Sequence, residues 1–395
     1  MTPICLYLQV HQPYRLRHYT YFDVGSRHDY FDDEANAGIL RRVAERAYRP
    51  ATGLFYRLAG RFGNRFSVAF SLSGTVIDQL RDWSGKTLDA FRQLAATGRV
   101  EFLAETYFHS LASIEDLEEF RAQVNLHRRA IESLTGKAPQ VFRNTELLFS
   151  DQIAAQAQEL GFRGILADGI EPLLGHRRPD FVYRCAGLDI RLLLRNFRLS
   201  DDIAFRFSER GWEQWPLTAE KYLQWIASLD GQADVINLFM DFETFGEHQR
   251  KETGIFDFFS AFVERFIEAG GRFVTPSEAI ARFAPRGQVH APRLVSWADE
   301  ARDASAWVGN RLQRHALDQL YAIKHDVLGS GDVDLITSWR RLTTSDHLYY
   351  MSTKSLADGT VHQYFNPYGS PYEAYITFMN VLADIEGRVG SPGGL

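Results

Sequence analysis

The stretch "VINLFMDFETFGEHQ" (residues 235–249) joins an apolar run to a cluster of acidic residues. Five of its first six residues are apolar, and Asp241, Glu243 and Glu247 follow within seven positions. A short apolar run bounded by polar residues is typical of a buried strand. The acids after it have two interpretations: a solvated loop with a helix N-cap, or a catalytic acid at the rim of a barrel. The rest of the sequence has to decide between them.

Similar short apolar runs recur along the first two thirds of the chain. Helix-like segments lie between several of them, at 113–136, 150–161 and 275–283. The second segment begins at Ser150, a residue type that caps helix N-termini, and ends at Gly161, which suits the position after a helix. The other strand-like runs are ICLYLQV (4–10), FSVAFSL (66–72), VEFLA (100–104), QVFRN (140–144), GILA (164–167), IRLLLR (190–195) and the weaker RFV (272–274).

The alternation of strand and helix predicts a parallel sheet. Repeated seven or eight times, it predicts a closed or nearly closed (β/α) barrel. An open, doubly wound sheet is the alternative, but no G-x-G-x-x-G motif follows the first strand, which weakens its dinucleotide-binding form. Residues 11–65 are too many for one crossover, so we expect an insertion beside the first barrel loop.

The pattern changes after residue 283. The segment "APRGQVHAPR" (284–293) has the composition of a linker, and residues 305–328 and 370–389 carry apolar residues at helical spacing. We therefore expect a barrel domain over 1–283 and a helical domain over 284–395 that packs against it. The tail "GSPGGL" is expected to be disordered.

Composition narrows the class of protein. Apolar residues make up 45% and charged residues 24% of the chain, and the net charge is −6, which argues against a nucleic-acid-binding protein. No window of 18 apolar residues predicts a membrane span, and the first residues do not resemble a signal peptide, so the cytoplasm is the expected location. Cys5 and Cys185 lie in apolar segments and are expected to be free, buried thiols.

Polar residues follow the predicted strands at the ends where parallel barrels carry their chemistry. Paired carboxylates at such a rim either hold a divalent metal or act directly on an acetal centre. No two histidines stand three or four positions apart, and H-E-x-x-H, P-loop, G-x-S-x-G and C-x-x-C motifs are absent. We therefore expect carboxylate chemistry without metal or cofactor. The residues concerned are His11, Glu105, His109, Arg143, Glu146, Asp168 and Asp241.

Six motifs occur in a fixed order: HQP (11–13), VEFLAETYFHSL (100–111), FRNTELLFSD (142–151), MDFETFGEHQ (240–249), SWADEARDASAWVGN (296–310) and TTSDHLYYMSTK (343–354). The first five resemble the conserved regions of glycoside hydrolase family 57, and the sixth resembles a segment of its α-amylase-like members. The resemblance extends from residue 4 to about residue 380. It implies an incomplete (β/α)7 barrel with a C-terminal helical domain, and a retaining mechanism on α-glucans. It also implies that Glu146 is the nucleophile and Asp241 the general acid/base.

The same resemblance implies a set of residues that line the substrate site: His11, Glu105, His109, Trp297, Asp303, Asp346 and His347. To these we add Arg143, Asp168, Phe245 and His248, with Phe245 and Trp297 as aromatic walls. Arg143 either holds Glu146 ionised or forms a salt bridge inside the barrel. His248 either contacts sugar hydroxyls or begins the next helix. Glu243, two positions after Asp241, is expected to point away from the site and is interpreted as structural.

The leading hypothesis is therefore a retaining, α-amylase-like hydrolase of α-1,4-glucosidic bonds. A 4-α-glucanotransferase or a 1,4-α-glucan branching enzyme of the same family is the alternative, because these enzymes share the motifs. A metal-dependent polysaccharide deacetylase and a non-catalytic carbohydrate-binding protein are the further hypotheses. An α-glucan or maltooligosaccharide is the expected partner, and the sequence leaves the oligomeric state and the preferred chain length open.

Overall fold

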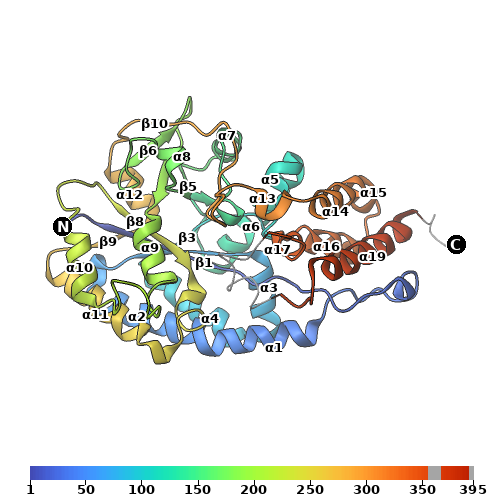
Figure 1. Ribbon diagram of the computed structural model, residues 1–395, viewed down its shortest axis with the longest axis horizontal. Helices are drawn as coiled ribbons and strands as arrows, with labels where there is room; N and C mark the ends of the chain where they lie inside the picture. The colour runs from blue at the N-terminus through green and yellow to red at the C-terminus, as the bar shows by residue number, and fades with distance from the viewer. Residues whose placement is uncertain (355–365, 391–395) are drawn as a thin grey trace.

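The computed structural model describes residues 1–354 and 366–390, so the end of the predicted disordered tail, 391–395, lies outside the described residues. Two sheets form the centre of the molecule (Figure 1). The first has the strand order β3-β2-β1-β8, with β9 also paired to β1, and the second has the order β10-β6-β7-β5-β4. Their strands are β1 (Ile4–Val10), β2 (Val68–Leu72), β3 (Val100–Phe102), β4 (Val141–Arg143), β5 (Gly164–Asp168), β6 (Val182–Cys185), β7 (Arg191–Arg195), β8 (Ile236–Asp241), β9 (Phe273–Val274) and β10 (Gln288–Val289).

The two sheets approach each other at both junctions. Beyond β3, Ala104 forms a parallel bridge with Phe142 of β4. On the opposite side, the Asn196 amide after β7 donates to the Asn237 carbonyl of β8 at 2.8 Å. Seven parallel strands, β1, β2, β3, β4, β5, β7 and β8, thus follow one another around an incompletely closed ring. The predicted incomplete (β/α)7 barrel is confirmed, and its seven strands are the seven strong apolar runs of the sequence.

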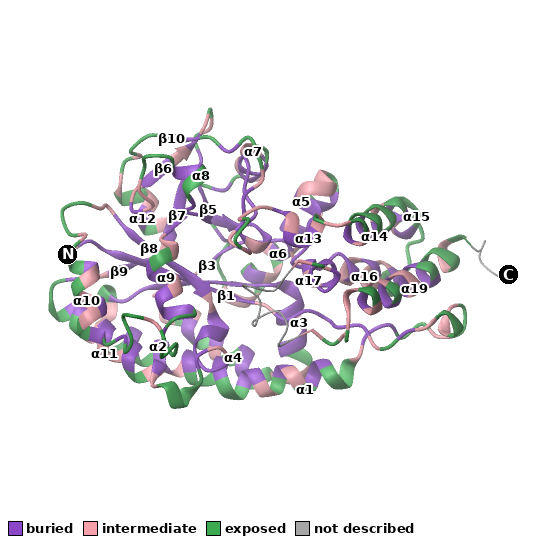
Figure 2. Ribbon diagram, in the orientation of Figure 1, coloured by how far each residue is buried: buried purple, intermediate pink, exposed green. Residues whose placement is uncertain are grey.

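Side chains of the strands alternate between two layers of the core. On β1, Ile4, Leu6 and Leu8 face the surrounding helices, whereas Cys5 and Tyr7 pack inside the barrel. The period-two alternation of a strand produces this division, and all seven residues of β1 are buried. Buried segments coincide with the strands and with the inner faces of the helices (Figure 2). Cys5 and Cys185 are free and buried, as predicted.

Two strands were not foreseen. β6 pairs antiparallel with β7, and β10 pairs parallel with β6 inside the segment expected to be a linker. The barrel helices are α3 (Gly74–Trp83), α4 (Gly85–Ala96), α5 (Ala112–Glu115), α6 (Leu117–Thr135), α7 (Asp151–Glu159), α8 (Glu171–Leu174), α9 (Phe197–Ala204), α10 (Ala219–Ala227), α11 (Ile255–Glu268) and α12 (Pro276–Arg282).

The expected insertion after β1 forms a long helical rod along one side of the barrel (Figure 1). It consists of α1 (Asp33–Val43), a π-helical turn (Ala44–Tyr48) and α2 (Arg49–Phe62), which follow one another without a break. Single π-turns within α-helices are frequent at functional sites. Here the turn places Tyr48 against the loop that follows β8, with its ring stacked on Phe242 at 5.8 Å between centroids.

The chain after residue 304 is helical over its described part. Its helices are α13 (Ser305–Val308), α14 (Arg311–Ala322), α15 (Lys324–Gly329), α16 (Val333–Leu342), α17 (Ser345–Tyr349) and α19 (Pro371–Gly390). The helix expected over 305–328 is divided because Asn310 caps a new start at α14 by accepting from the Gln313 amide. Buried residues of this region share one hydrophobic cluster with β5 and β7. The boundary between two domains at residue 284 stays a prediction. Among the described residues, no helix is both long enough and apolar enough to cross a membrane.

Gly246 provides a test of the contact between the rod and the β8 loop. Its φ is +115°, and a Cβ there would lie 2.0 Å from the Arg46 carbonyl oxygen. We expect Gly246→Ala to reduce the free energy of unfolding by more than the roughly 1–2 kcal/mol that a left-handed residue costs alone. Gly25→Ala is the control, because Gly25 has φ +76° but open space around it. Equal losses in urea unfolding of the two variants would contradict the close contact.

Candidate active site

A cavity of about 560 Å³ opens at the C-terminal ends of the barrel strands. Strand ends of both sheets contribute to its wall, and so do the segment around residue 300 and helix α17, which lies far from the barrel strands in the sequence. Eight of the residues proposed from the sequence line this cavity: His11, His109, Arg143, Glu146, Asp241, His248, Trp297 and Asp346.

Glu146 is held at both carboxylate oxygens. It lies in the short 3-10 turn η4 (Thr145–Leu147) directly after β4, with φ +55°, and the next residue, Leu147, has φ +49°. Its Oε1 lies 3.1 Å from His109 Nε2, and its Oε2 accepts from Trp297 Nε1 at 2.8 Å. Two successive left-handed residues are uncommon outside glycine and are found preferentially at functional sites. The strained turn and the two donors together fix the direction of this carboxylate.

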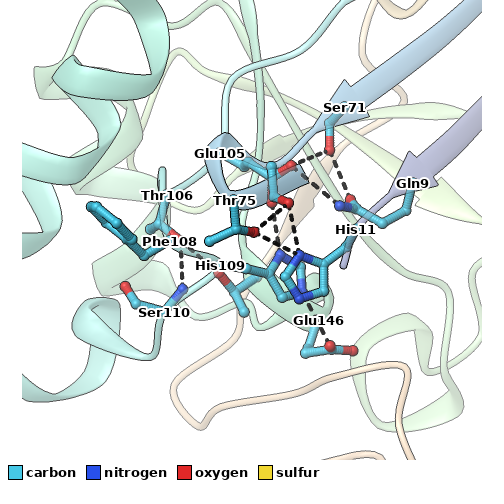
Figure 3. A network of polar contacts seen from close by, with 12 residues as sticks. Gln9, His11, Ser71, Thr75, Glu105, Thr106, Phe108, His109, Ser110 and Glu146 are labelled. Carbon is cyan, nitrogen blue, oxygen red and sulfur yellow. Dashed lines mark hydrogen bonds and ion pairs between the residues drawn. The ribbon is translucent and has the colours of Figure 1, made fainter. Parts of the chain in front are cut away.

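Behind Glu146 lies an ion pair removed from solvent (Figure 3). His109 Nδ1 is 2.8 Å from Oε2 of Glu105, whose side chain is completely buried. Burial disfavours the charged form of His109, but the bonds to Glu105 and Glu146 outweigh it and raise its pKa to about 9. Burial likewise disfavours ionised Glu105, yet the bond from His109 and its charge lower the Glu105 pKa to about 2. The pair is therefore an imidazolium and a carboxylate at neutral pH.

His11 stacks on His109 with ring centroids 3.9 Å apart. Burial, reinforced by the charge of His109, lowers the pKa of His11, so this ring is neutral. Its Nδ1 lies 2.7 Å from Ser73 Oγ and its Nε2 lies 3.0 Å from Asp346 Oδ2. A proton on Nε2 satisfies both contacts, because His11 then donates to Asp346 and accepts from Ser73. The helical region thus supplies a carboxylate to the barrel mouth through α17.

Two carboxylates meet the cavity from the end of β8. Asp241 is the last residue of that strand, and Glu243 follows in the 3-10 turn η5 (Phe242–Thr244). The expectation that Glu243 points away is wrong, because residues two positions apart lie on one face of a strand, and Glu243 lines the cavity together with Asp241. Glu243 is 5% exposed and accepts a hydrogen bond from the Tyr48 hydroxyl of the π-turn. Burial, together with the charge of Asp241, raises the pKa of Glu243 to about 8.

Arg143 and Trp297 form the floor beside Glu146. The Arg143 guanidinium is fully buried and lies 5.1 Å from the centre of a Trp297 ring. Among the described residues, its three nitrogens have no hydrogen-bond partner. The barrel salt bridge considered for Arg143 is therefore not formed within that part of the chain. Its positive charge helps to lower the pKa of Glu105.

The other five proposed residues lie outside the cavity wall, and substrate contact by them stays a prediction. Glu105 lies behind His109, and Phe245 packs in the core against Phe259 with ring centroids 4.9 Å apart. Asp168, completely buried, lies 3.5 Å from Arg195 and 3.2 Å from Arg302, so it anchors these two lining arginines. Asp303 accepts from the Ser305 amide at the start of α13. His347 is buried near Phe378, and burial lowers its pKa to about 4.

Several lining residues escaped the sequence analysis. Arg195 is the charged last residue of the β7 run, and that position alone could have identified it. Arg302 lies within the fifth motif, and it and Asp299 both have positive φ values, +50° and +55°, which no sequence pattern announces. In residues 1–354 and 366–390, no three or more His, Cys, Asp or Glu side chains are grouped so that they could hold a metal ion.

Comparison with known proteins agrees with this architecture. The model described as "Glycosyl hydrolase family 57" matches residues 5–292. A Methanocaldococcus jannaschii protein named "Putative alpha-amylase" is 41% identical over 392 residues, which cover 96% of this chain and 83% of that protein. A family 57 branching enzyme of Thermococcus kodakaraensis has a similar structure, with a TM-score of 0.69 at 14% identity over 92% of this chain and 87% of the other.

A further structural relative is the 4-alpha-glucanotransferase of Thermococcus litoralis. Its TM-score is 0.66 at 16% identity, over 88% of this chain, and this chain spans only 56% of the length of that enzyme. At these low identities, both structural comparisons establish a shared fold.

Glu243 makes the stability of the fold depend on pH. Its pKa is about 8 in the folded chain against an ordinary value of 4.5, so above pH 4.5 the folded state binds more protons than the unfolded state. Stability contributed by this site therefore falls as pH rises from about 4.5 to about 8, by up to about 1.4 kcal/mol per pH unit. We expect Glu243→Gln to gain stability relative to the native chain over that range, measured by urea unfolding at several pH values. Glu209→Gln, at an exposed position on the same cavity, is the control. A pH-independent difference between Glu243→Gln and the native chain would contradict the assigned proton.

Proposed function

The chain belongs to glycosyl hydrolase family 57, and on that premise we propose that it is a retaining enzyme acting on α-1,4-glucosidic bonds of α-glucans, with α-amylase-like hydrolysis as its main reaction. The observation that carries the proposal is the placement of Glu146 and Asp241 on one cavity, at the ends of β4 and β8. These two strands lie in different sheets, so only the assembled barrel brings the two acids to the same space. Retaining glycosidases need one such carboxylate as nucleophile and one as acid and base.

In the first half of the proposed reaction, Glu146 attacks the anomeric carbon while Asp241 protonates the departing glycosidic oxygen. The result is a covalent glycosyl-enzyme. The bonds from His109 and Trp297 support this role for Glu146, because they hold both of its oxygens before substrate arrives. In the second half, Asp241 has lost its proton and acts as a base toward the incoming hydroxyl group.

Proton transfer by Asp241 contributes on the order of 10²- to 10⁴-fold to the rate of each half-reaction. The carboxylates of Asp346 and Asp299 and the ring of His11 also reach the cavity and suit hydrogen bonding to sugar hydroxyls. The aromatic face of Trp297 and the half-exposed ring of Phe205 give apolar surface on the same wall. A cavity with such a mixture of donors, acceptors and flat apolar faces suits a carbohydrate.

The acceptor in the second half-reaction decides between hydrolysis and transfer. We expect water to be the acceptor, so that maltoheptaose incubated with the protein gives shorter maltooligosaccharides and a rising number of reducing ends. Redistributed chain lengths without new reducing ends would identify a 4-α-glucanotransferase, and new α-1,6 linkages in the proton NMR spectrum would identify a branching enzyme.

We expect the hydrolysis of maltoheptaose to be unchanged in EDTA, because the two-carboxylate mechanism uses no metal ion. Activity lost in EDTA and restored by zinc would contradict the glycosidase mechanism and favour the deacetylase hypothesis.

Substitution of the two carboxylates tests their separate roles. Glu146→Gln keeps the shape of the side chain but removes the nucleophile, so we expect turnover to fall by several orders of magnitude with an unchanged circular dichroism spectrum. Asp241→Asn removes the proton donor, so hydrolysis of maltoheptaose should fall far more than hydrolysis of an activated aryl α-maltooligosaccharide, whose leaving group needs no proton. If Glu146→Gln retains native activity, Glu146 is not the nucleophile. Equal losses on both substrates would remove Asp241 from the acid role.

A further inference from the structure

The two-carboxylate mechanism assigns no role to the buried ion pair of His109 and Glu105 behind Glu146. We propose that Glu105 is a positioning residue. Through His109 it fixes the protonation of that ring and the direction in which the ring faces Glu146. This inference rests on the proposed function, because it takes Glu146 as the nucleophile. Glu105 itself lies outside the cavity wall, with His109 between it and Glu146 (Figure 3).

Glu105 is anchored more firmly than a single ion pair would require. Its Oε1 accepts from Ser71 Oγ at 2.8 Å and from Gln9 Nε2 at 3.2 Å, and its Oε2 contacts His109. Its own backbone amide donates to His127 Nδ1 at 3.2 Å. Gln9 and Ser71 tie the carboxylate to β1 and β2, and His127 of α6 ties down the backbone of the same residue. With this many donors, the buried carboxylate is held in place and in turn orients the His109 ring.

The orientation of the His109 ring is fixed by its contacts. Both of its ring nitrogens contact carboxylates, one on Glu105 and one on Glu146, and its side chain, stacked on His11, is 2% exposed. Its backbone has φ +52°, and its amide donates to the Thr106 carbonyl at 3.0 Å. The ring is thus held by the backbone, by stacking and by Glu105. A hydrogen placed on Nε2 must therefore point at Glu146.

The charges of the three groups explain why a glutamate, and not a neutral acceptor, is useful at position 105. A lone imidazolium beside Glu146 would cancel the negative charge that stabilises an oxocarbenium-like transition state. With Glu105 ionised, the histidine is already neutralised, so the three groups together keep one negative charge. The nucleophile gains a fixed donor without loss of that charge.

The other titratable groups that face His109 do not replace Glu105. His11, stacked on the ring, and His127, on the far side of Glu105, both have lowered pKa values, chiefly through burial, and are neutral. Arg143 adds positive charge near Glu105 from β4. Glu146 is the second acid that contacts the ring. Without Glu105, burial opposes the charged form of His109, and Glu146 remains to favour it.

Glu105→Gln tests the inference, with Glu119→Gln as matched control. Glu119 is equally buried and ion-paired, to Arg340 Nε at 2.8 Å, but lies on α6 against the helical region and does not line the cavity. We expect Glu105→Gln to lower kcat on an activated aryl α-maltooligosaccharide by about 10- to 100-fold, the worth of a charge-assisted hydrogen bond, with little change in KM. The acid limb of the kcat/KM profile should move to higher pH, because a neutral His109 no longer favours the ionised form of Glu146. Glu105→Asp, which keeps the charge, should recover part of the loss.

A second measurement reads the histidine directly and needs no substrate. In protein labelled with 15N-histidine, His109 should titrate near pH 9 in the native chain and at a lower pH in Glu105→Gln. Glu119→Gln should leave both the titration and the pH profile unchanged, whatever it does to stability. A native His109 that titrates below pH 7, or a Glu105→Gln variant with the native pH profile, would overturn the inference. Failure of the proposed function would give a different result. Glu146→Gln would keep full activity, while His109 of the native chain would still titrate near pH 9.

Discussion

Strand β1 is hydrogen-bonded on both edges, and its register sets what meets at the cavity. Its residue Gln9 lies opposite Ser71 of β2 on one side and opposite Asp241 of β8 on the other. Because parallel strands end at the same edge of a sheet, this one alignment places the Glu105 anchor and the acid of β8 at equal height on the rim. A shift of β1 by one residue would turn Gln9 away from the barrel interior and break both relations.

The rim also depends on segments that do not belong to the barrel. Trp297 donates to Glu146 from the segment that follows the last strands, and Asp346 contacts His11 from α17. On the other side, the Tyr48 hydroxyl reaches Glu243 from the insertion after β1. Each of these contacts gives a hydrogen-bond partner to a largely buried acid, and a buried polar group without such a partner would be costly. The helical region and the rod are therefore parts of the site as well as of the fold.

Much of this arrangement could be predicted from the sequence, and the failures have identifiable causes. The strand-like runs gave the barrel because parallel strands covered on both faces are continuous and apolar. β6 was missed because it is four residues long and includes Arg184, and β10 has only two residues. Motif resemblance predicted the two acids that the structure places on one cavity, Glu146 and Asp241, but not the direction of every side chain near them. Phe245 was misjudged because β8 ends at Asp241 and the 3-10 turn that follows directs Phe245 into the core. Glu243 was misjudged because residues two positions apart share a face of a strand, so it belongs on the side of Asp241.

Of the non-glycine residues described with positive φ, His109, Glu146, Asp299 and Arg302 line the cavity, and Leu147 directly follows Glu146. Such conformations cost on the order of 1–3 kcal/mol each, and the surrounding contacts must hold them in place. Selection for thermal stability alone would therefore find its easiest gains here, by replacing these residues with glycine. Each such gain would remove a side chain from the rim. Stability and activity therefore oppose each other at these positions, and laboratory evolution of this chain for stability would lose activity there.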